Sequence, residues 1–217
     1  IEIHKKHDIP ATFFITGKTL ESNPTEYQEL LDDKLFEVAS HTYSHKMLLD
    51  HPFCGPAINE QGKKLEISLG KDLIEHVFNR QCLGLRPGCG FTEGLKSVPG
   101  ILKLIHEAGY QYISSILWGP HFTMPSPLNR PFTYGAEGFP KLWELPGHGW
   151  HENILKSNSL GPQRILLFPP LMPQAIPEDF VKTPEEEFKI NNKIFIDKAI
   201  TSRMPHVSLI WHPWSLY

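Results

Sequence analysis

Short apolar segments rich in β-branched and aromatic residues alternate along this chain with longer amphipathic segments. The short segments predict strands at 11–16, 36–40, 82–87, 110–117, 141–146 and 206–211. The longer ones predict helices at 24–33, 59–79, 98–109 and 183–202. Strands that alternate with helices predict a parallel sheet with helices outside it. We therefore expect an α/β fold, and six or more strands fit either a barrel or a doubly wound sheet.

Local signals support three of these helices. Asn23 and Pro24 suit the start of the first helix, as a cap and as a proline at the first helical position. Thr183 and Glu186 form the capping-box pattern at the start of the last one. In the helix at 59–79, a spacing of four predicts one packed face, made of Leu65, Leu69, Leu73 and Val77.

Polar residues follow several of the predicted strands. In a parallel α/β sheet, the loops after the carboxyl ends of the strands carry the chemistry. The residues at these ends are His41 and His45 after one strand, Arg86 after another, His148 and Trp150 after another, and His212 after the last. We therefore expect a functional site at this rim.

The segment EVASHTYSH places two imidazoles four residues apart. If the chain turns helically after Ser40, His41 and His45 share one face. Two such imidazoles can bind Zn²⁺ at about 2.0–2.1 Å, and a catalytic site adds a third protein ligand and a water. Thr42 and Ser44 can hold the turn through hydrogen bonds to the backbone. The alternative is a pair of ordinary surface histidines, because H-x-x-x-H alone is a weak pattern.

Composition argues against two classes of protein. A formal net charge of −3 is unlike a nucleic-acid-binding protein, which usually carries a basic excess. No apolar run approaches the roughly 18 residues that a membrane span needs. The 217 residues suit a single domain, 1–217. Cys54, Cys82 and Cys89 show no paired framework, so we expect free thiols, or one pair and one free thiol.

Five segments are informative in combination. They are IPATFF at 9–14, EVASHTYSH at 37–45, LRPGCG at 85–90, a tryptophan after a late strand, and LIWHP at 209–213. In this order and spacing, they resemble the polysaccharide deacetylase family, the NodB-homology or carbohydrate esterase family 4 group. The H-[ST]-x-x-H motif after EVAS is the most specific part. The segments ELP and HPWSL lean towards a branch with allantoinase-like and atypical deacetylases.

The resemblance implies a distorted (β/α) barrel and metal-dependent removal of an acyl group from an N-acetylated sugar, or sometimes from an O-acetylated one. By position in the motifs, His41 and His45 would be metal ligands. Arg86 would hold the catalytic base in place, and His212 would be the general acid. The cofactor would be a divalent metal, Zn²⁺ first, with Co²⁺ or Ni²⁺ as alternatives.

The family's first motif is a strand that ends in two aspartates, one the general base and the other the third metal ligand. This strand should precede IPATFF. Because the sequence begins only shortly before Ile9, we expect the barrel's first strand and its aspartates upstream of Ile1. A real loss of the motif would give a weakened or inactive protein, and His148 would then be the reserve third ligand.

Two further motifs depart from the family pattern. The third motif has Cys89 where an aromatic residue is usual, but a backbone N–H there, beside Gly90, could still bind an oxyanion. The fourth motif retains a tryptophan, Trp150, which we expect to line the substrate cleft. Its aspartate is absent, and Glu144 is the candidate replacement.

We therefore expect a metal-dependent hydrolase of C–N bonds other than peptide bonds, acting on N-acetyl groups of an amino sugar or polysaccharide. An allantoinase-like hydrolase of a cyclic amide and a non-catalytic carbohydrate-binding relative are the alternatives. A polysaccharide substrate implies the cell envelope or secretion, and an allantoinase-like one implies the cytoplasm. The partner would be a carbohydrate or small amide, not a nucleic acid, and the sequence predicts no oligomeric state.

Overall fold

The structure is a computed structural model that describes residues 1–122, 126–150, 189 and 196–210. The chain forms two compact units. The first comprises Ile1–Cys89, Leu95–Ser114 and Thr133–Trp143, and the second comprises Gly90–Gly94, Ser115–Phe132 and Glu144–Tyr217. Among the described helices, none has the length and apolar character needed to cross a membrane.

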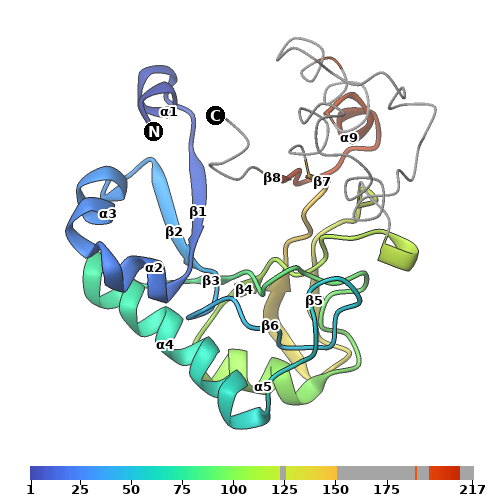
Figure 1. The fold of residues 1–217 in the computed structure, drawn as a ribbon. Helices are drawn as coiled ribbons and strands as arrows, with labels where there is room; N and C mark the ends of the chain where they lie inside the picture. Colours follow the sequence, from blue (N-terminus) through green and yellow to red (C-terminus); the bar gives the residue numbers. More distant parts are fainter. Residues whose placement is uncertain (123–125, 151–188, 190–195, 211–217) are drawn as a thin grey trace, which may run out of the picture. The chain divides into compact units, whose positions relative to one another are not determined.

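A six-stranded sheet runs through the first unit (Figure 1). Its strands, in spatial order, are β1 (Ala11–Ile15), β2 (Phe36–Ser40), β3 (Gly84–Leu85), β4 (Tyr112–Ile113), β6 (Phe139–Glu144) and β5 (Phe132–Tyr134). The pairs β1–β2, β2–β3 and β3–β4 are parallel. Four of the five residues of β2 are buried, as expected for a strand covered on both faces. The predicted α/β fold with a mostly parallel sheet is confirmed.

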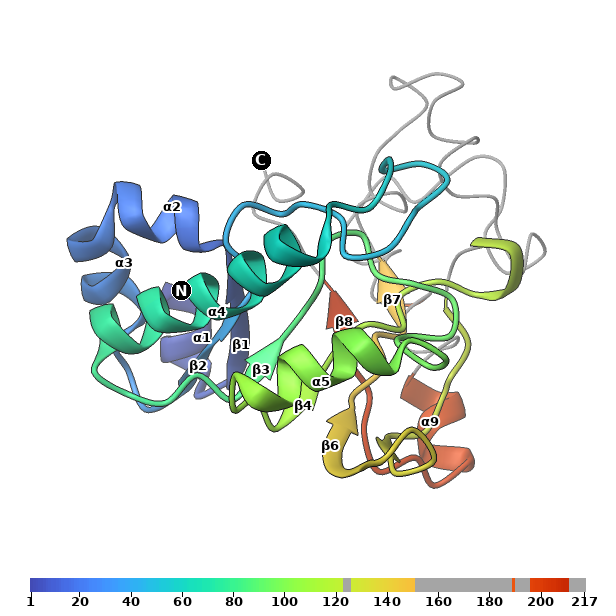
Figure 2. The same ribbon diagram turned by 90° about the horizontal axis from the view of Figure 1, so that it is seen from below.

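Five helices belong to the first unit: α1 (Glu2–His7), α2 (Gly17–Ser22), α3 (Pro24–Leu31), α4 (Glu60–Phe78) and α5 (Pro99–Glu107). Helix α4 packs against β2, α2, α3 and α5, and α4 and α5 cover the same face of the sheet (Figures 1 and 2). Asn23 does precede α3, although its side chain makes no capping hydrogen bond.

The predicted packed face of α4 is wrong by one to two positions. Leu65 is 49% exposed, whereas the buried residues are Glu66, Ile67, Gly70, Lys71, Ile74 and Phe78. A Cβ atom on Gly70 would lie 2.7 Å from Ser40 Oγ and 2.8 Å from the carbonyl carbon of Thr42. Gly70 therefore allows the helix to approach the end of β2 closely, and this contact sets which face is buried.

The second unit contains the remaining described elements. Strands β7 (Gly149–Trp150) and β8 (Leu209–Ile210) form a parallel pair. A 3₁₀ turn (η1, Pro120–Phe122) and helix α9 (Asp197–Thr201) accompany them. Helix α9 and β8 lie within the helix and strand predicted at 183–202 and 206–211. The capping box at Thr183 lies outside the described residues.

The cysteines form one disulfide and one free thiol. Cys54 and Cys89 are bonded, with their Cα atoms 6.6 Å apart, and Cys82 is buried as a free thiol. The expectation of three free thiols is wrong, and the alternative of one pair with one free thiol is confirmed.

Candidate metal site

Three residues of the first unit directly follow the carboxyl ends of three neighbouring strands. His41 follows β2, Arg86 follows β3 and Ser114 follows β4. Each donates its backbone N–H to a carbonyl of the neighbouring strand, at 2.8–2.9 Å. Because the strands are parallel, these backbone hydrogen bonds bring the three residues to one edge of the sheet. The predicted rim is therefore present for His41 and Arg86.

The rings of His41 and His45 meet edge to face. Their centroids are 4.6 Å apart and their planes are at 84°. His41 Nδ1 lies 2.7 Å from the carbonyl oxygen of Arg86. A carbonyl can only accept, so Nδ1 carries the proton and Nε2 carries the lone pair of the neutral ring. A hydrogen bond of this kind is the usual orienting contact of a histidine that binds metal through its other nitrogen.

The turn between the two histidines is not helical, so this part of the prediction is wrong. Thr42 and His45 have left-handed backbone conformations, with φ of 64° and 63°. For a residue other than glycine, this conformation costs about 1–2 kcal/mol. The rings meet because the chain reverses at these two residues, and the surrounding contacts must stabilise that reversal.

Hydrogen bonds within the turn account for part of this stabilisation. Ser40 Oγ accepts the backbone N–H of Thr42 at 3.2 Å. Thr42 Oγ1 accepts the backbone N–H of His45 at 3.1 Å. The prediction that Thr42 holds the turn through its hydroxyl is confirmed.

Helices α2 and α4 hold the turn from outside. The first N–H groups of α2, from Gly17 and Lys18, donate to the carbonyls of Thr42 and Tyr43 at 2.9 and 2.7 Å. On the other side, the backbone carbonyl of Glu66 in α4 accepts the N–H of Tyr43 at 2.9 Å. The turn is thus fixed by two helices that the sequence places far apart.

Glu66 is the residue that the sequence reasoning missed. Its side chain is 2% exposed, and its carboxylate accepts the backbone N–H of Ser44 at 2.7 Å and the Ser44 hydroxyl at 2.5 Å. Ser44 therefore holds the turn through Glu66 and not through a backbone group of its own loop. The signal in the sequence was the position of Glu66 beside Ile67 in an amphipathic helix. Both residues lie on the buried face of that helix.

Arg86 lies across the same edge of the sheet. Its guanidinium carbon is 4.0 Å from the centre of the Phe14 ring, and Nη2 donates to Ser114 Oγ at 2.9 Å. Planar stacking and fixed donors suit a guanidinium that orients a carboxylate. Its predicted role in holding a catalytic base stays a prediction.

The electrostatics of His45 suit a metal ligand. Protein atoms packed around the ring disfavour its charged form and lower the pKa of His45, although the Glu66 carboxylate acts in the opposite direction. The ring is therefore neutral at neutral pH. Neutral imidazole is the form that coordinates a metal.

Cys89 and Gly90 follow Arg86 in the loop after β3. Both have left-handed backbone conformations, with φ of 59° and 63°. A Cβ atom on Gly90 would lie 2.4 Å from Leu117 Cγ, so only glycine fits there. The Cys89 side chain is bonded to Cys54, which leaves its backbone N–H as the group proposed for substrate contact.

His51, Cys54 and Cys89 form a cluster whose potential ligand atoms all lie within 4.8 Å of one another. The disulfide leaves no thiolate in this cluster, and thiolates are the form of cysteine that binds metal. His51 Nδ1 also accepts the backbone N–H groups of Phe53 and Cys54, both at 3.2 Å. We therefore interpret the cluster as a structural cross-link between the loop that contains Cys54 and the loop that contains Cys89.

Two residues of the second unit have structural partners. The buried carboxylate of Glu144 accepts the N–H and hydroxyl of Ser115, both at 2.7 Å, and the N–H of Ile116 at 2.8 Å. The buried His148 accepts the N–H of Ser208 at Nδ1 and faces the carbonyl of Asn129 from Nε2, at 3.0 and 2.9 Å. Both ring nitrogens are engaged, so the expectation of His148 as a reserve ligand is wrong. The bonds of Glu144 indicate an anchor for the chain after β4.

The other predicted site residues lie further along the chain. The backbone of Trp150 belongs to β7 in the second unit. His212 lies outside the described residues.

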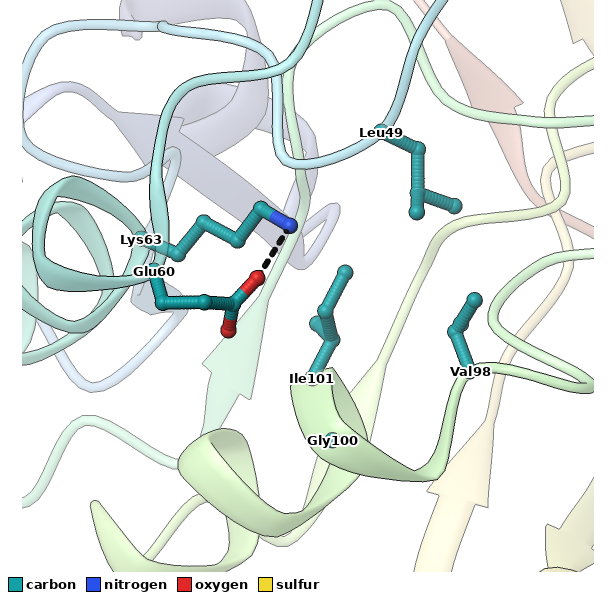
Figure 3. Close-up of a pocket in the computed structure, with 6 residues that line it drawn as sticks. All are labelled: Leu49, Glu60, Lys63, Val98, Gly100 and Ile101. Atoms are coloured by element: carbon teal, nitrogen blue, oxygen red, sulfur yellow. Dashed lines mark hydrogen bonds and ion pairs between the residues drawn. The ribbon is translucent and has the colours of Figure 1, made fainter.

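One pocket of about 200 Å³ lies elsewhere in the first unit (Figure 3). Lys63 Nζ and a carboxylate oxygen of Glu60 are 2.7 Å apart on one side of it, and apolar side chains line the other. Its lining residues are Leu49, Glu60, Lys63, Val98, Gly100 and Ile101. None of the candidate site residues contributes to this pocket, so it does not define the site.

Comparison with known proteins gives a consistent picture. The family model described as polysaccharide deacetylase matches residues 1–113. No curated protein matches the sequence. Three similar solved structures are a Mycobacterium smegmatis protein assigned to the polysaccharide deacetylases (18% identity, TM-score 0.61), a Pseudomonas aeruginosa PAO1 protein with the same assignment (14%, 0.58), and the PuuE allantoinase (13%, 0.58).

Each of these similarities covers 96% of this chain but only 60%, 56% and 56% of the respective solved chain. At these identities, the likeness concerns the fold, and it confirms the expected NodB-type α/β fold. The family match covers both the histidine motif and the LRPGCG segment. The chain belongs to the polysaccharide deacetylase family.

Proposed function

We propose that this chain carries the core of a metal-dependent hydrolase that removes N-acetyl groups from an amino sugar or polysaccharide. The observation that supports it most is the convergence of the His41 and His45 rings beside the Arg86 carbonyl. These residues lie at the carboxyl edge of a parallel sheet, in a chain of the polysaccharide deacetylase family.

The residues present fit a divalent metal. His41 presents Nε2 because its Nδ1–H is held by a carbonyl, and the pKa of His45 is lowered so that its ring is neutral. When bound, the ion supplies an activated water and polarises the substrate carbonyl. Two imidazoles suit Zn²⁺, with Co²⁺ and Ni²⁺ as alternatives.

The remaining steps fall to other residues of the protein. Arg86 holds the carboxylate base, and the backbone N–H of Cys89, beside Gly90, stabilises charge on the carbonyl oxygen. His212 protonates the leaving amine, since an imidazole titrates near the working pH. Trp150 provides an aromatic face for the sugar. By the family resemblance, the third ligand and the base would be the two aspartates of the family's first motif.

The disulfide supports a polymer substrate over a cyclic amide. Cys54 and Cys89 are bonded, and disulfides form and persist in oxidising compartments such as the cell envelope or the extracellular space. A polysaccharide is met in those compartments. An allantoinase-like enzyme of the cytoplasm would face a reducing pool of thiols.

The test uses the full-length protein and two substrates, N-acetylglucosamine oligomers and allantoin. We expect acetate release from the oligomers, loss of it on chelation, and recovery with Zn²⁺, Co²⁺ or Ni²⁺. Activity that is indifferent to chelation would remove the metal mechanism. Turnover of allantoin alone would overturn the proposed substrate, and sugar binding without turnover would favour a non-catalytic relative.

A variant separates the acid from the metal site. His212→Ala should lower kcat about 10²–10⁴-fold while the metal stays bound, because general acid catalysis contributes that range. A wild-type rate in this variant would remove His212 from the mechanism.

A further inference from the structure

We propose that Glu66 is a positioning residue for the metal site, because it fixes the Tyr43–Ser44 peptide and thereby the reversal that brings His45 against His41. The proposal rests on the proposed function, which makes these histidines the metal ligands. Among the described residues, Glu66 makes no hydrogen bond to either ring, so it positions the rings through the backbone. Its charge also acts on the pKa of His45, which it raises.

Glu66 reaches the turn with both its backbone and its side chain. Its carbonyl accepts the N–H of Tyr43 at 2.9 Å. Its carboxylate accepts the N–H and the hydroxyl of Ser44 at 2.7 and 2.5 Å. Two consecutive N–H groups of the turn thus end on one residue of α4, and the next residue along the chain is His45.

Burial makes these bonds strong. Glu66 is 2% exposed, and a buried carboxylate without donors is costly, so the charge and the turn stabilise each other. Hydrogen bonds to a carboxylate are shorter and stronger than those between neutral groups. This contact can therefore offset the cost of the left-handed conformations at Thr42 and His45.

Neighbouring contacts fix the depth at which Glu66 reaches the turn. Gly70, one turn further along α4, lies so close to Ser40 and Thr42 that no side chain fits between them. Glu66 and Gly70 therefore present the same helix face to the turn, one as a hydrogen-bond acceptor and the other as a close backbone contact.

The experiment compares Glu66→Ala and Glu66→Gln with Glu75→Gln in the full-length protein. Glu75 is a matched control on the same helix, since its carboxylate also accepts a backbone N–H, from Cys82 at 3.0 Å. Two readouts are measured: the nuclear Overhauser effect between the rings of His41 and His45 without metal, and the affinity for Zn²⁺ against a chromophoric chelator. Thermal unfolding is recorded for each variant.

We expect Glu66→Ala to lose the ring contact and to bind Zn²⁺ about 10–100-fold more weakly, the usual effect of removing an outer partner of a metal ligand. Glu66→Gln should retain most of both, because its amide can accept the Ser44 N–H and donate to the hydroxyl. Glu75→Gln should lower stability and leave both readouts unchanged. If Glu66→Ala does not fold, Ser44→Ala takes its place and should weaken the ring contact.

A wild-type ring contact and Zn²⁺ affinity in a folded Glu66→Ala variant would overturn the positioning role. So would equal losses of both readouts in Glu66→Ala and Glu75→Gln, since these would reflect stability alone. If the wild-type protein binds no Zn²⁺, the metal part of the proposed function fails. The ring contact measured without metal still decides the role of Glu66 in that case.

Discussion

Removal of the disulfide should destabilise the first unit by an amount that follows from its position. Cys54 and Cys89 are separated by 35 residues, which include all of α4 and β3. In the chain-entropy description, opening a loop of this length costs about 4 kcal/mol. Since a domain is stable by roughly 5–15 kcal/mol, this loss is a large fraction of the total.

The variant to measure is the double substitution Cys54→Ser with Cys89→Ser. Urea unfolding of the oxidised protein and of the variant gives the difference in the free energy of unfolding, and wild-type protein in a dithiol reductant should match the variant. In the folded protein, burial raises the pKa of the Cys82 thiol to about 12 and keeps it unreactive.

A loss below about 1 kcal/mol would refute this reasoning. It would mean that the loop that contains Cys54 and the loop that contains Cys89 are already held together by other contacts. The first contact to consider is the close approach of Gly88 to Met47, where a Cβ atom would lie 2.7 Å from Met47 Cε.

Three further predictions concern packing and charge. Gly70→Ala should destabilise the protein by about 1–3 kcal/mol in urea unfolding, because its Cβ would lie 2.7 Å from Ser40 Oγ. The control Gly100→Ala has open space around it and should be neutral or stabilising, so equal effects of the two substitutions would contradict this. Glu144→Gln should lower the melting temperature, since three donors converge on that carboxylate; an unchanged value would remove its anchoring role. Burial lowers the pKa of His148 below its ordinary 6.5, so the unfolded chain takes up the proton first and the urea midpoint should fall as the pH drops from 7.5 to 5.5; a midpoint that rises over this range would refute it.

Much of the order of elements in the first unit could be predicted, because hydrophobic periodicity indicates which residues are buried. Helix α2 and strand β5 were not predicted. The strand at 36–40 and the helix at 59–79 correspond to β2 and α4 within a residue at each end. The site edge could be predicted as well, since parallel strands place His41 and Arg86 together wherever the loops go.

Long-range geometry could not be predicted in the same way. The face that α4 buries depends on a close approach of Gly70 to the end of β2, not on its leucines. The histidine turn depends on left-handed residues held by Glu66, which lies about 20 residues further along the chain, in a separate helix. The spacing of four residues correctly paired the rings of His41 and His45. The helical turn that we expected to bring them together is not present.

The measurement that tests the central claim most directly is the zinc content of the full-length protein and of its His45→Ala variant. Both are equilibrated with Zn²⁺, desalted and analysed by elemental mass spectrometry, with His106→Ala as the control for an exposed histidine on α5. The account predicts about one ion per chain in the wild type and the control, and little in folded His45→Ala. Wild-type zinc content in His45→Ala would contradict it.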